Sequence, residues 1–312
     1  MARPKSGFAC HVKAYRLTKE WSQEELAEKV DVRRQAIYDI ESGRYLPNTA
    51  IALRLARLFG CRVEDLFVEQ AEKTIILMGC DPAFEILGQH ISRLAPDARV
   101  HCRFASSHRA LEGLAEGVAH VAGTHLHNTG SAESNVVTAG RKLAGVSGRV
   151  LGFSLLEEGL MVAKGNPLGV RTVADLARPM VRFVNREPGA ALRVLLDDLL
   201  QRAGIPVDAV NGYRNQVTSH REGAYRIACN VADAALGLRA IAEAYGLGFV
   251  PITNVRCDLV IPNDLSRHPT IRILLDVLQS AALRREIDTL PGYDGSVTGK
   301  VIAELIPDSG HA

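Results

Sequence analysis

The sequence lacks any long apolar run. No stretch of its 312 residues reaches the roughly 20 apolar residues that a membrane-spanning helix needs. The opening segment, MARPKSGFACHVKAYRLTKEW, has no apolar centre of the kind that marks a secretion signal. These absences argue against a membrane or secreted protein, and we expect a globular protein of the cytoplasm without membrane contact.

Paired cysteines and a strong overall charge are also missing. The six cysteines (Cys10, Cys61, Cys80, Cys102, Cys229 and Cys257) are scattered without a C-x-x-C pair, so we expect free and mostly buried thiols. The net charge is +2, but residues 1–60 hold 11 Lys/Arg against 7 Asp/Glu, whereas residues 71–312 hold 25 of each. A mildly basic head on a neutral body is typical of a nucleic-acid-binding module fused to another domain.

Two short helices joined by a tight turn are predicted within WSQEELAEKVDVRRQAIYDIESGR. Ser22 and Glu25 have the spacing of a capping box at the start of the first helix. The turn falls at Asp31, and the second helix directs Ile37 and Ile40 inward. This arrangement leaves the opposite face of the second helix free for a partner.

That free face carries residues that can read DNA. Arg34, Gln35 and Tyr38 project from it, and Arg can read guanine while Gln can read adenine in the major groove. A solvated face on a protein-binding bundle is the alternative.

Residues 22–67, SQEELAEKVDVRRQAIYDIESGRYLPNTAIALRLARLFGCRVEDLF, resemble the helix-turn-helix of the Cro/C1-type repressors, the XRE family. The resemblance implies that residues 1–72 form an all-α helix-turn-helix bundle that binds double-stranded operator DNA. Asp31 replaces the glycine that the family often has in the turn, but Asp tolerates the left-handed conformation. A single head makes few contacts, so we expect a homodimer. The predicted DNA-binding residues are Gln23, Arg33, Arg34, Gln35, Tyr38, Asp39, Arg44 and Tyr45.

From residue 73 onward, strand-like and helix-like segments alternate. TIILMG, RVHCRFA and HVAGTHL read as the first strands, and VLGFSLL, GLMVAKG, GFVPI and CDLVIP as four separate later ones. Residues 269–288 read as one closing helix. The alternation predicts a mainly parallel, doubly wound α/β domain that binds its ligand beyond the carboxyl ends of the strands.

Polar residues gather at these predicted strand ends. Hydroxyls, imidazoles, guanidinium groups and helix N-termini would converge there, as in a cleft for a small anionic or polar ligand. The candidate ligand-binding residues are Cys80, Asp81, Ser106, Ser107, Thr124, His125, His127, Asn185, Arg186, Gly189, Ala190, Arg193, Ser219, His220 and Asp233.

The segments at 123–128, 183–205, 218–220, 231–252 and 257–262 resemble the two-lobed, type II periplasmic-binding-protein fold. More narrowly, they are similar to the cytosolic PBP-like domain of molybdate-binding proteins and their regulators. The resemblance implies a sensor at residues 73–312, with molybdate or tungstate as a candidate effector and no cofactor. The family loop commonly reads Asn-Arg-x-x-Gly-Ser-Gly-Thr-Arg, and here Ala190 and Leu192 replace its Ser and Thr. Because two hydroxyl donors are missing, a small organic acid that Leu192 could touch is the alternative effector.

Several of these residues have plainer explanations. Ser219 has the spacing of a capping residue, and Ser107 and Asp81 can also cap helices. His125 with His127, or Cys80 with His220, could hold a metal ion, but their spacing matches no zinc pattern, so no metal is predicted.

Two other functions remain open. An acid–base pair of Asp81 and His125 is conceivable, but no nucleophile is tied to a base and an orienting group, so we do not expect an enzyme. A body that serves for dimerisation alone would not need so many polar strand ends. The sequence therefore predicts a ligand-responsive transcriptional regulator.

Overall fold

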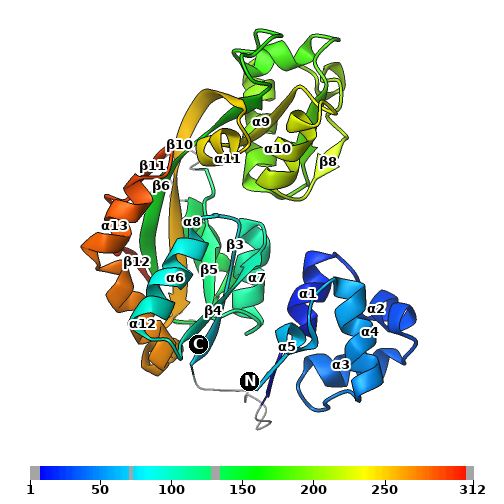
Figure 1. Ribbon diagram of the computed structural model, residues 1–312, viewed down its shortest axis with the longest axis vertical. Coiled ribbons are helices and arrows are strands. Elements are labelled where there is room, and N and C mark those ends of the chain that lie inside the picture. Colours follow the sequence, from blue (N-terminus) through cyan, green and yellow to red (C-terminus); the bar gives the residue numbers. More distant parts are fainter. Residues whose placement is uncertain (1–7, 70–72, 128–133, 307–312) are drawn as a thin grey trace, which may run out of the picture.

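The computed structural model describes residues 8–69, 73–127 and 134–306, and the predicted domain boundary after residue 72 lies at the edge of a segment outside these ranges. Figure 1 shows a helical head beside the lower of two lobes, which two long strands connect to the upper lobe. Within the described ranges, no helix combines the length and the apolar character required to cross a membrane.

The head is a bundle of short helices. They are α1 (Val12–Thr18), α2 (Gln23–Val30), α3 (Arg34–Glu41), α4 (Thr49–Phe59) and α5 (Val63–Leu66), closed by an antiparallel pair of β1 (Phe8–Cys10) and β2 (Phe67–Glu69). The Ser22 hydroxyl accepts a hydrogen bond from the Glu25 amide at 3.1 Å, and the Glu25 carboxylate accepts one from the Ser22 amide at 2.6 Å. The capping box is therefore confirmed. Asp31 forms the turn after α2 and adopts the left-handed conformation, with φ of 57°.

The body is built on one mixed sheet in the order β4-β3-β5-β10-β6-β9-β7-β8. Strands β3 (Thr74–Gly79), β4 (Arg99–Phe104) and β5 (Val121–Thr124) run parallel in the lower lobe. Strands β7 (Phe183–Arg186), β8 (Gln216–Val217) and β9 (Ala234–Leu238) run parallel in the upper lobe. The carboxyl ends of β3, β5 and β7 bring the residues at 80–81, 124–127 and 185–186 to the junction of the lobes.

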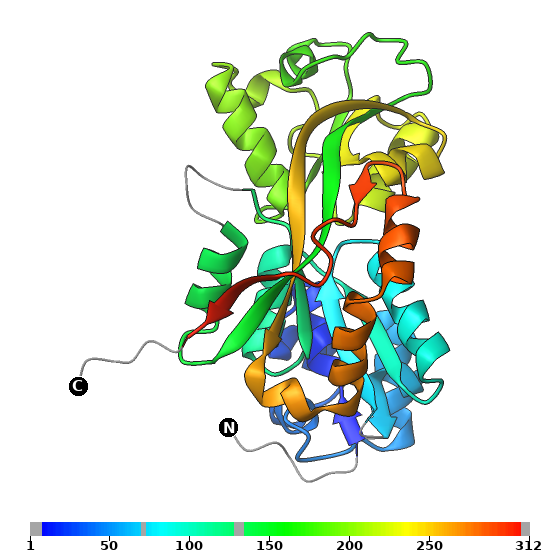
Figure 2. The ribbon, with the colours of Figure 1, turned by 90° about the vertical axis from the view of Figure 1, so that its left-hand side faces the viewer.

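Two antiparallel strands of 15 residues each, β6 (Gly148–Val162) and β10 (Gly248–Pro262), run through both lobes (Figure 2). The predictions of four separate strands and of a mainly parallel sheet were wrong. Glu157 and Glu158 had looked like a break in an apolar pattern, but they lie within β6. Glu158 is fully buried because histidines pair with it.

Helices cover both faces of the sheet. They are α6 (Phe84–Leu94), α7 (Ser107–Ala115), α8 (Ser134–Lys142), α9 (Ala191–Arg202), α10 (His220–Ala228), α11 (Arg239–Ala244), α12 (Pro269–Leu278) and α13 (Ala281–Asp288). The single closing helix that was predicted is divided in two, because the Ser280 hydroxyl caps a new helix. Two short strands that were not predicted, β11 (Tyr293–Asp294) and β12 (Val301–Leu305), pair with β6.

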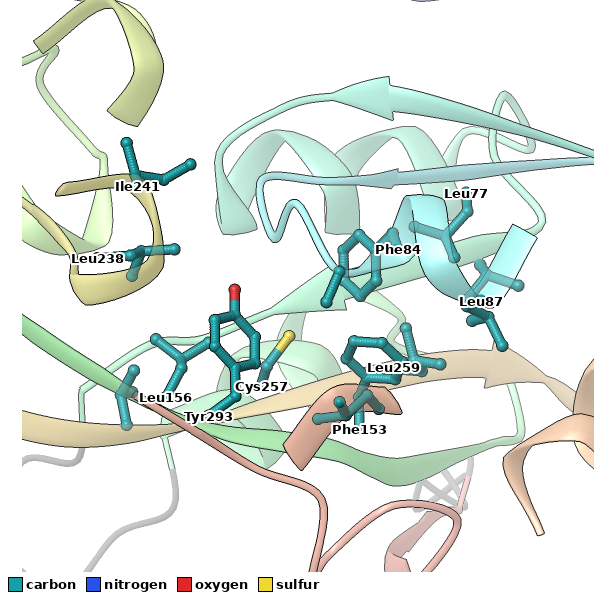
Figure 3. Packing of buried hydrophobic residues seen from close by; sticks show 14 of the residues in the cluster. Leu77, Phe84, Leu87, Phe153, Leu156, Leu238, Ile241, Cys257, Leu259 and Tyr293 are labelled. Atoms are coloured by element: carbon teal, nitrogen blue, oxygen red, sulfur yellow. The ribbon is translucent and has the colours of Figure 1, made fainter. Parts of the chain in front are cut away.

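The largest apolar core lies under α6, α12 and α13. Figure 3 shows Phe84 of α6 facing Phe153 of β6, with ring centroids 5.0 Å apart. Tyr293 and Cys257 belong to the same buried cluster, and their polar atoms lie where this core meets the site described next.

Candidate functional site

The predicted DNA-binding residues other than Gln23 lie between Arg33, the N-cap residue of α3, and the turn after that helix, and most of them are exposed. Arg33, Arg34, Gln35, Arg44 and Tyr45 are exposed to solvent. Tyr38 is 42% exposed, and the Arg44 guanidinium lies 5.5 Å from the centre of its ring. Asp39 is half-buried, and it accepts a hydrogen bond from Gln35 at 3.2 Å. The face thus presents cations, amides and aromatic rings together.

Gln23 differs from the others. Its amide donates to Glu41 at 2.8 Å, and Glu41 is also paired with Arg16. The Gln23 side chain, at the start of α2, therefore takes part in a half-buried network inside the head.

A buried polar cluster lies where the lobes meet. The Cys80 sulfur, just after β3, is 2.6 Å from Nε2 of His125, just after β5. Nδ1 of His125 is 3.1 Å from one Glu158 oxygen, and Nε2 of His127 is 2.8 Å from the other. Cys80 and His125 are each 3% exposed. The sequence predicts no nucleophile tied to a base and an orienting group; the structure corrects this, because Cys80, His125 and Glu158 form such a chain.

Charge in this cluster is balanced locally. Burial opposes protonation of His125, but the neighbouring Cys80 and Glu158 outweigh it and hold the pKa of His125 well above its ordinary value. Burial acts to raise the pKa of Glu158, but hydrogen bonds from His125 and His127 lower it overall. The two groups therefore form an ion pair at neutral pH.

His220 reaches the cluster from the upper lobe, as the first residue of α10. Its ring centroid is 6.0 Å from that of His125, and it is 1% exposed. Both of its ring nitrogens are buried without a hydrogen-bond partner among the described residues. Burial, together with the nearby charges of Arg186 and His125, lowers the pKa of His220 well below its ordinary value. His220 is therefore a neutral imidazole whose polar atoms face the cluster without partners.

Asp81 forms the other wall of the cluster. It accepts hydrogen bonds from the Ala83 amide at 2.8 Å, from the Tyr293 hydroxyl at 2.7 Å and from the Ser154 hydroxyl at 3.3 Å. Burial raises the pKa of Asp81 above its ordinary value. The prediction that Asp81 caps the helix was wrong: the N-cap residue of α6 is Ala83, and the bond from the Ala83 amide to Asp81 closes the turn that precedes the helix.

The loop at residues 185–193 is largely bound to itself. Arg186 is 4% exposed and pairs through two nitrogens with Glu187, at 2.8 and 2.9 Å, and it also donates to the Thr218 carbonyl. Arg193 pairs with Asp197 and stacks on Tyr213. Each of the two arginines is thus already paired with a carboxylate.

The rest of this loop has structural roles. The Asn185 side chain bridges backbone groups, donating to the Tyr213 carbonyl and accepting from the Arg186 amide. Gly189 adopts φ of +83°, and buried Ala190 precedes α9. Leu192 is 1% exposed inside the upper-lobe core, so the expectation that it could touch a ligand was wrong.

The remaining predicted residues divide into two groups. Ser107 is buried, and its hydroxyl accepts a hydrogen bond from the His125 amide at 3.1 Å, which joins it to the cluster. It does not cap α7, because the N-cap residue is Ser106; Thr124 is the last residue of β5 and is fully buried. Ser219 accepts the Glu222 amide at 3.0 Å, which confirms its capping role.

Asp233 does not lie with the others. It precedes β9, at the amino end of the strand, and pairs with Arg182 just before β7. It was misplaced because the prediction treated the start of a strand as its end.

Cavities add one observation about access. A cavity of about 390 Å³ lies between the lobes and β10, and His127 connects it to the cluster. It is lined by Leu126, His127, Asn135, Leu195, Asp198, Leu199, Arg202 and residues 252–256. A larger hollow of about 590 Å³ lies between α6 and β4, but its lining includes no predicted ligand residue.

The cysteines are unpaired, as expected, but less buried than expected. Cys80 and Cys257 are buried, Cys10, Cys61 and Cys102 are half-buried, and Cys229 is exposed.

Comparison with known proteins fits both halves of the chain. Residues 88–279, more than half of the chain, match the family model described as a PBP superfamily domain. The chain belongs to this PBP-like family. Residues 12–66 of this PBP-like protein match the helix-turn-helix family. Over 308 residues, covering 92% of this chain and 99% of the relative, it is 26% identical to the uncharacterized protein YvgK of Bacillus subtilis.

The head has its own relatives. Over 62 residues, it is 42% identical to an uncharacterized HTH-type transcriptional regulator of Archaeoglobus fulgidus, covering 20% of this chain and 89% of the relative. The PBP-like protein therefore contains a helix-turn-helix module of the type found in transcriptional regulators.

Solved structures confirm the fold of the body. PEB3 with bound L-phospholactate superposes with a TM-score of 0.52 at 16% identity, over 70% of this chain and 99% of that one. The sulfate-binding protein SubI of Mycobacterium tuberculosis gives a TM-score of 0.51 at 13% identity, over 71% and 86%. At such identities the likeness establishes a periplasmic-binding-protein fold, which confirms the predicted two-lobed architecture.

Proposed function

We propose that this PBP-like protein is a cytoplasmic transcriptional regulator whose head, residues 1–72, binds operator DNA and whose body, residues 73–312, binds an effector between its lobes. The observation that carries the proposal is a helix-turn-helix with an exposed Arg34–Gln35–Tyr38 face on a two-lobed domain that has buried polar groups from both lobes at its junction. Such a junction changes when a ligand favours one arrangement of the lobes.

Helix α7 supplies a route from the junction to the head (Figure 1). Its first residue, Ser107, is hydrogen-bonded to His125 in the cluster. At its other end Glu116 pairs with Lys13 of the head at 2.8 Å. A shift of α7 therefore reaches α1 directly, and in a dimer it would alter the spacing of the two heads on their half-sites.

The effector is proposed to be small and polar, and small anions are the first class to test. Of the two solved structures above, one contains bound L-phospholactate and the other is a sulfate-binding protein. The family resemblance adds molybdate and tungstate as candidates. Arg186 is already paired with Glu187, and the loop lacks two hydroxyl donors. We therefore expect modest molybdate affinity at best, with a small organic acid as the alternative.

Selection of bound DNA from a random pool by the full-length protein tests the DNA-binding role. We expect an enriched near-palindromic site that is bound at least about 10³-fold more tightly than random DNA. Thermal shift with molybdate, tungstate, sulfate and small carboxylates then identifies effectors, because a ligand of the folded state raises the melting temperature. Absence of any enriched sequence would refute the regulator.

A second candidate, catalysis by Cys80, has one observation in its favour: the Cys80–His125–Glu158 chain has the order of nucleophile, base and orienting group. Burial of the sulfur opposes it, because a substrate could reach Cys80 only through opening of the lobes. Labelling by iodoacetamide at Cys80 faster than at exposed Cys229 would favour this candidate.

A further inference from the structure

Three metal-binding side chains converge at the junction of the lobes. Ligand atoms of Cys80, His125 and His220 all lie within 4.8 Å of one another, and all three residues are buried. Cys80 and His125 come from the lower lobe, and His220 comes from the upper lobe. Of the two pairs considered from the sequence alone, Cys80 with His220 is contained in this set, whereas His125 is joined by these two residues and not by His127.

His220 is the observation that points to a ligand. Leaving a buried polar atom without a hydrogen bond is destabilising, and here both ring nitrogens lack a partner among the described residues. A catalytic chain of Cys80, His125 and Glu158 leaves this imidazole unexplained. An ion placed between His220, Cys80 and His125 gives one of these two nitrogens a partner.

The surroundings of His125 fit the same explanation. Metal-bound histidines usually donate their second ring N–H to a carboxylate, which orients the ring. In His125, Nε2 faces Cys80 while Nδ1 is 3.1 Å from Glu158. Glu158 is completely buried in the middle of β6, and orienting a ligand gives this carboxylate a role.

We propose that Cys80, His125 and His220 bind a borderline-soft divalent ion of the Zn(II) class and thereby join the two lobes. Thiolate and imidazole ligands select such ions, and three protein ligands leave a fourth position for water. Bonds of about 2.0–2.3 Å place tetrahedral ligand atoms about 3.5 Å apart, so Cys80 and His125 would separate by about 1 Å on binding. The ion takes the place of the proton between them, which leaves to solvent. The metal site itself does not depend on the proposed function. Only the further idea that the ion acts as the effector rests on it.

The test is a Co(II) titration of metal-free, full-length protein, followed by competition with Zn(II). We expect one ion per chain, with visible bands of tetrahedral cobalt and a thiolate-to-cobalt charge-transfer band. Cys80→Ser should remove the charge-transfer band, and Cys80→Ser and His220→Gln should each weaken binding by at least about 100-fold. The matched controls, Cys229→Ser at an exposed thiol and His90→Gln at an imidazole paired with Glu286, should bind as the unaltered protein does.

A second measurement needs no variant. X-ray absorption of the Zn(II)-loaded protein should show one sulfur at about 2.3 Å and at least two nitrogens at about 2.0–2.1 Å. An ion without a sulfur ligand, less than one ion per chain, or tight binding that survives both substitutions would overturn the site. DNA affinity with and without Zn(II) is measured separately: failure to bind any specific DNA would refute the regulator and leave the metal result standing.

Discussion

Because the head is held together by a buried ion pair, we expect that one substitution can unfold the head and leave the body folded. Arg16 of α1 donates to the Glu41 carboxylate at 2.6 and 3.0 Å, and the two side chains are 8% and 3% exposed. Arg16 also donates to the Trp21 carbonyl at 2.7 Å, and Gln23 donates to Glu41 at 2.8 Å. One pair therefore ties α1, the start of α2 and the end of α3 together.

Glu41→Gln keeps the shape of the side chain but removes its charge. Arg16 would then remain charged in a buried site, which costs about 3–5 kcal/mol. A head of about 60 residues has a free energy of unfolding of roughly 3–9 kcal/mol, at 0.05–0.15 kcal/mol per residue. The loss is comparable with the whole stability of the head, so we expect α1 to α5 to be near their unfolding midpoint while the body stays folded.

Hydrogen–deuterium exchange measured by mass spectrometry separates the two parts. In Glu41→Gln the amides of α2 and α3 should exchange rapidly, those of β6 and β10 should keep their protection, and DNA binding should fall. The double variant Arg16→Met/Glu41→Leu should restore protection, because no unpaired charge remains. If Glu41→Gln lowers the opening free energy of α3 by less than about 1 kcal/mol, the pair behaves as a surface pair and the reasoning is refuted.

Four further predictions concern the DNA, the effector, pH and assembly. In gel-shift titrations, Gln35→Ala should weaken binding to the selected DNA site by about 1–3 kcal/mol and relax the base preference, whereas Arg44→Ala should weaken binding to selected and scrambled DNA alike and flatten the salt dependence. Unchanged binding by Gln35→Ala would contradict the proposed recognition helix. Ala190→Ser should strengthen molybdate binding in calorimetry because it returns one hydroxyl donor, whereas Leu192→Thr should lower the melting temperature because Leu192 packs in the upper-lobe core. Sub-micromolar molybdate binding by the unaltered protein that Ala190→Ser does not improve would contradict the expected role of the missing donor. Burial lowers the pKa of His11 to about 4 in the folded protein, so as the pH falls the unfolded chain binds a proton first, and the free energy of unfolding should decrease by at most about 3 kcal/mol between pH 6.5 and 4. In urea unfolding, His11→Asn should show a flatter pH dependence than the unaltered protein, and an equal slope would show that another group is responsible. Light scattering should give a homodimer at micromolar concentration, and a monomer that stays a monomer on operator DNA would count against it.

The sequence predicted local structure well where the signals were local. The capping box at Ser22 and Glu25 and the turn at Asp31 depend on a few neighbouring residues, and both appear as predicted. The strand ends at Cys80 and His125 were also recognised, because apolar runs end beside them.

Long-range pairing could not be predicted in the same way. Glu158 looked like an interruption because charge normally marks the surface, and its histidine partners become visible only when β5 lies near β6. Tyr293, Ser154 and Cys257 were missed since none of them follows a predicted strand end. Arg186 was counted as a free cation because the sequence does not show how the adjacent Glu187 folds back on it. One signal could have been used: Ser154 is a hydroxyl residue inside the apolar run VLGFSLL, and a buried hydroxyl needs a polar partner. In the structure that partner is Asp81.

The connectivity of the two lobes has a consequence for synthesis on the ribosome. The upper lobe is nearly contiguous, since β7 to β9 and α9 to α11 lie between the end of β6 and the start of β10. The lower lobe needs distant parts: β12 pairs with β6, and the Tyr293 hydroxyl reaches Asp81 across 212 residues. At roughly 5–20 residues per second, about 10–40 s pass between translation of Asp81 and translation of Tyr293. The head and the upper lobe can therefore fold during translation, whereas β3 to β5 wait with incomplete cover, which makes the lower lobe the part of the nascent chain most exposed to aggregation and most dependent on chaperones.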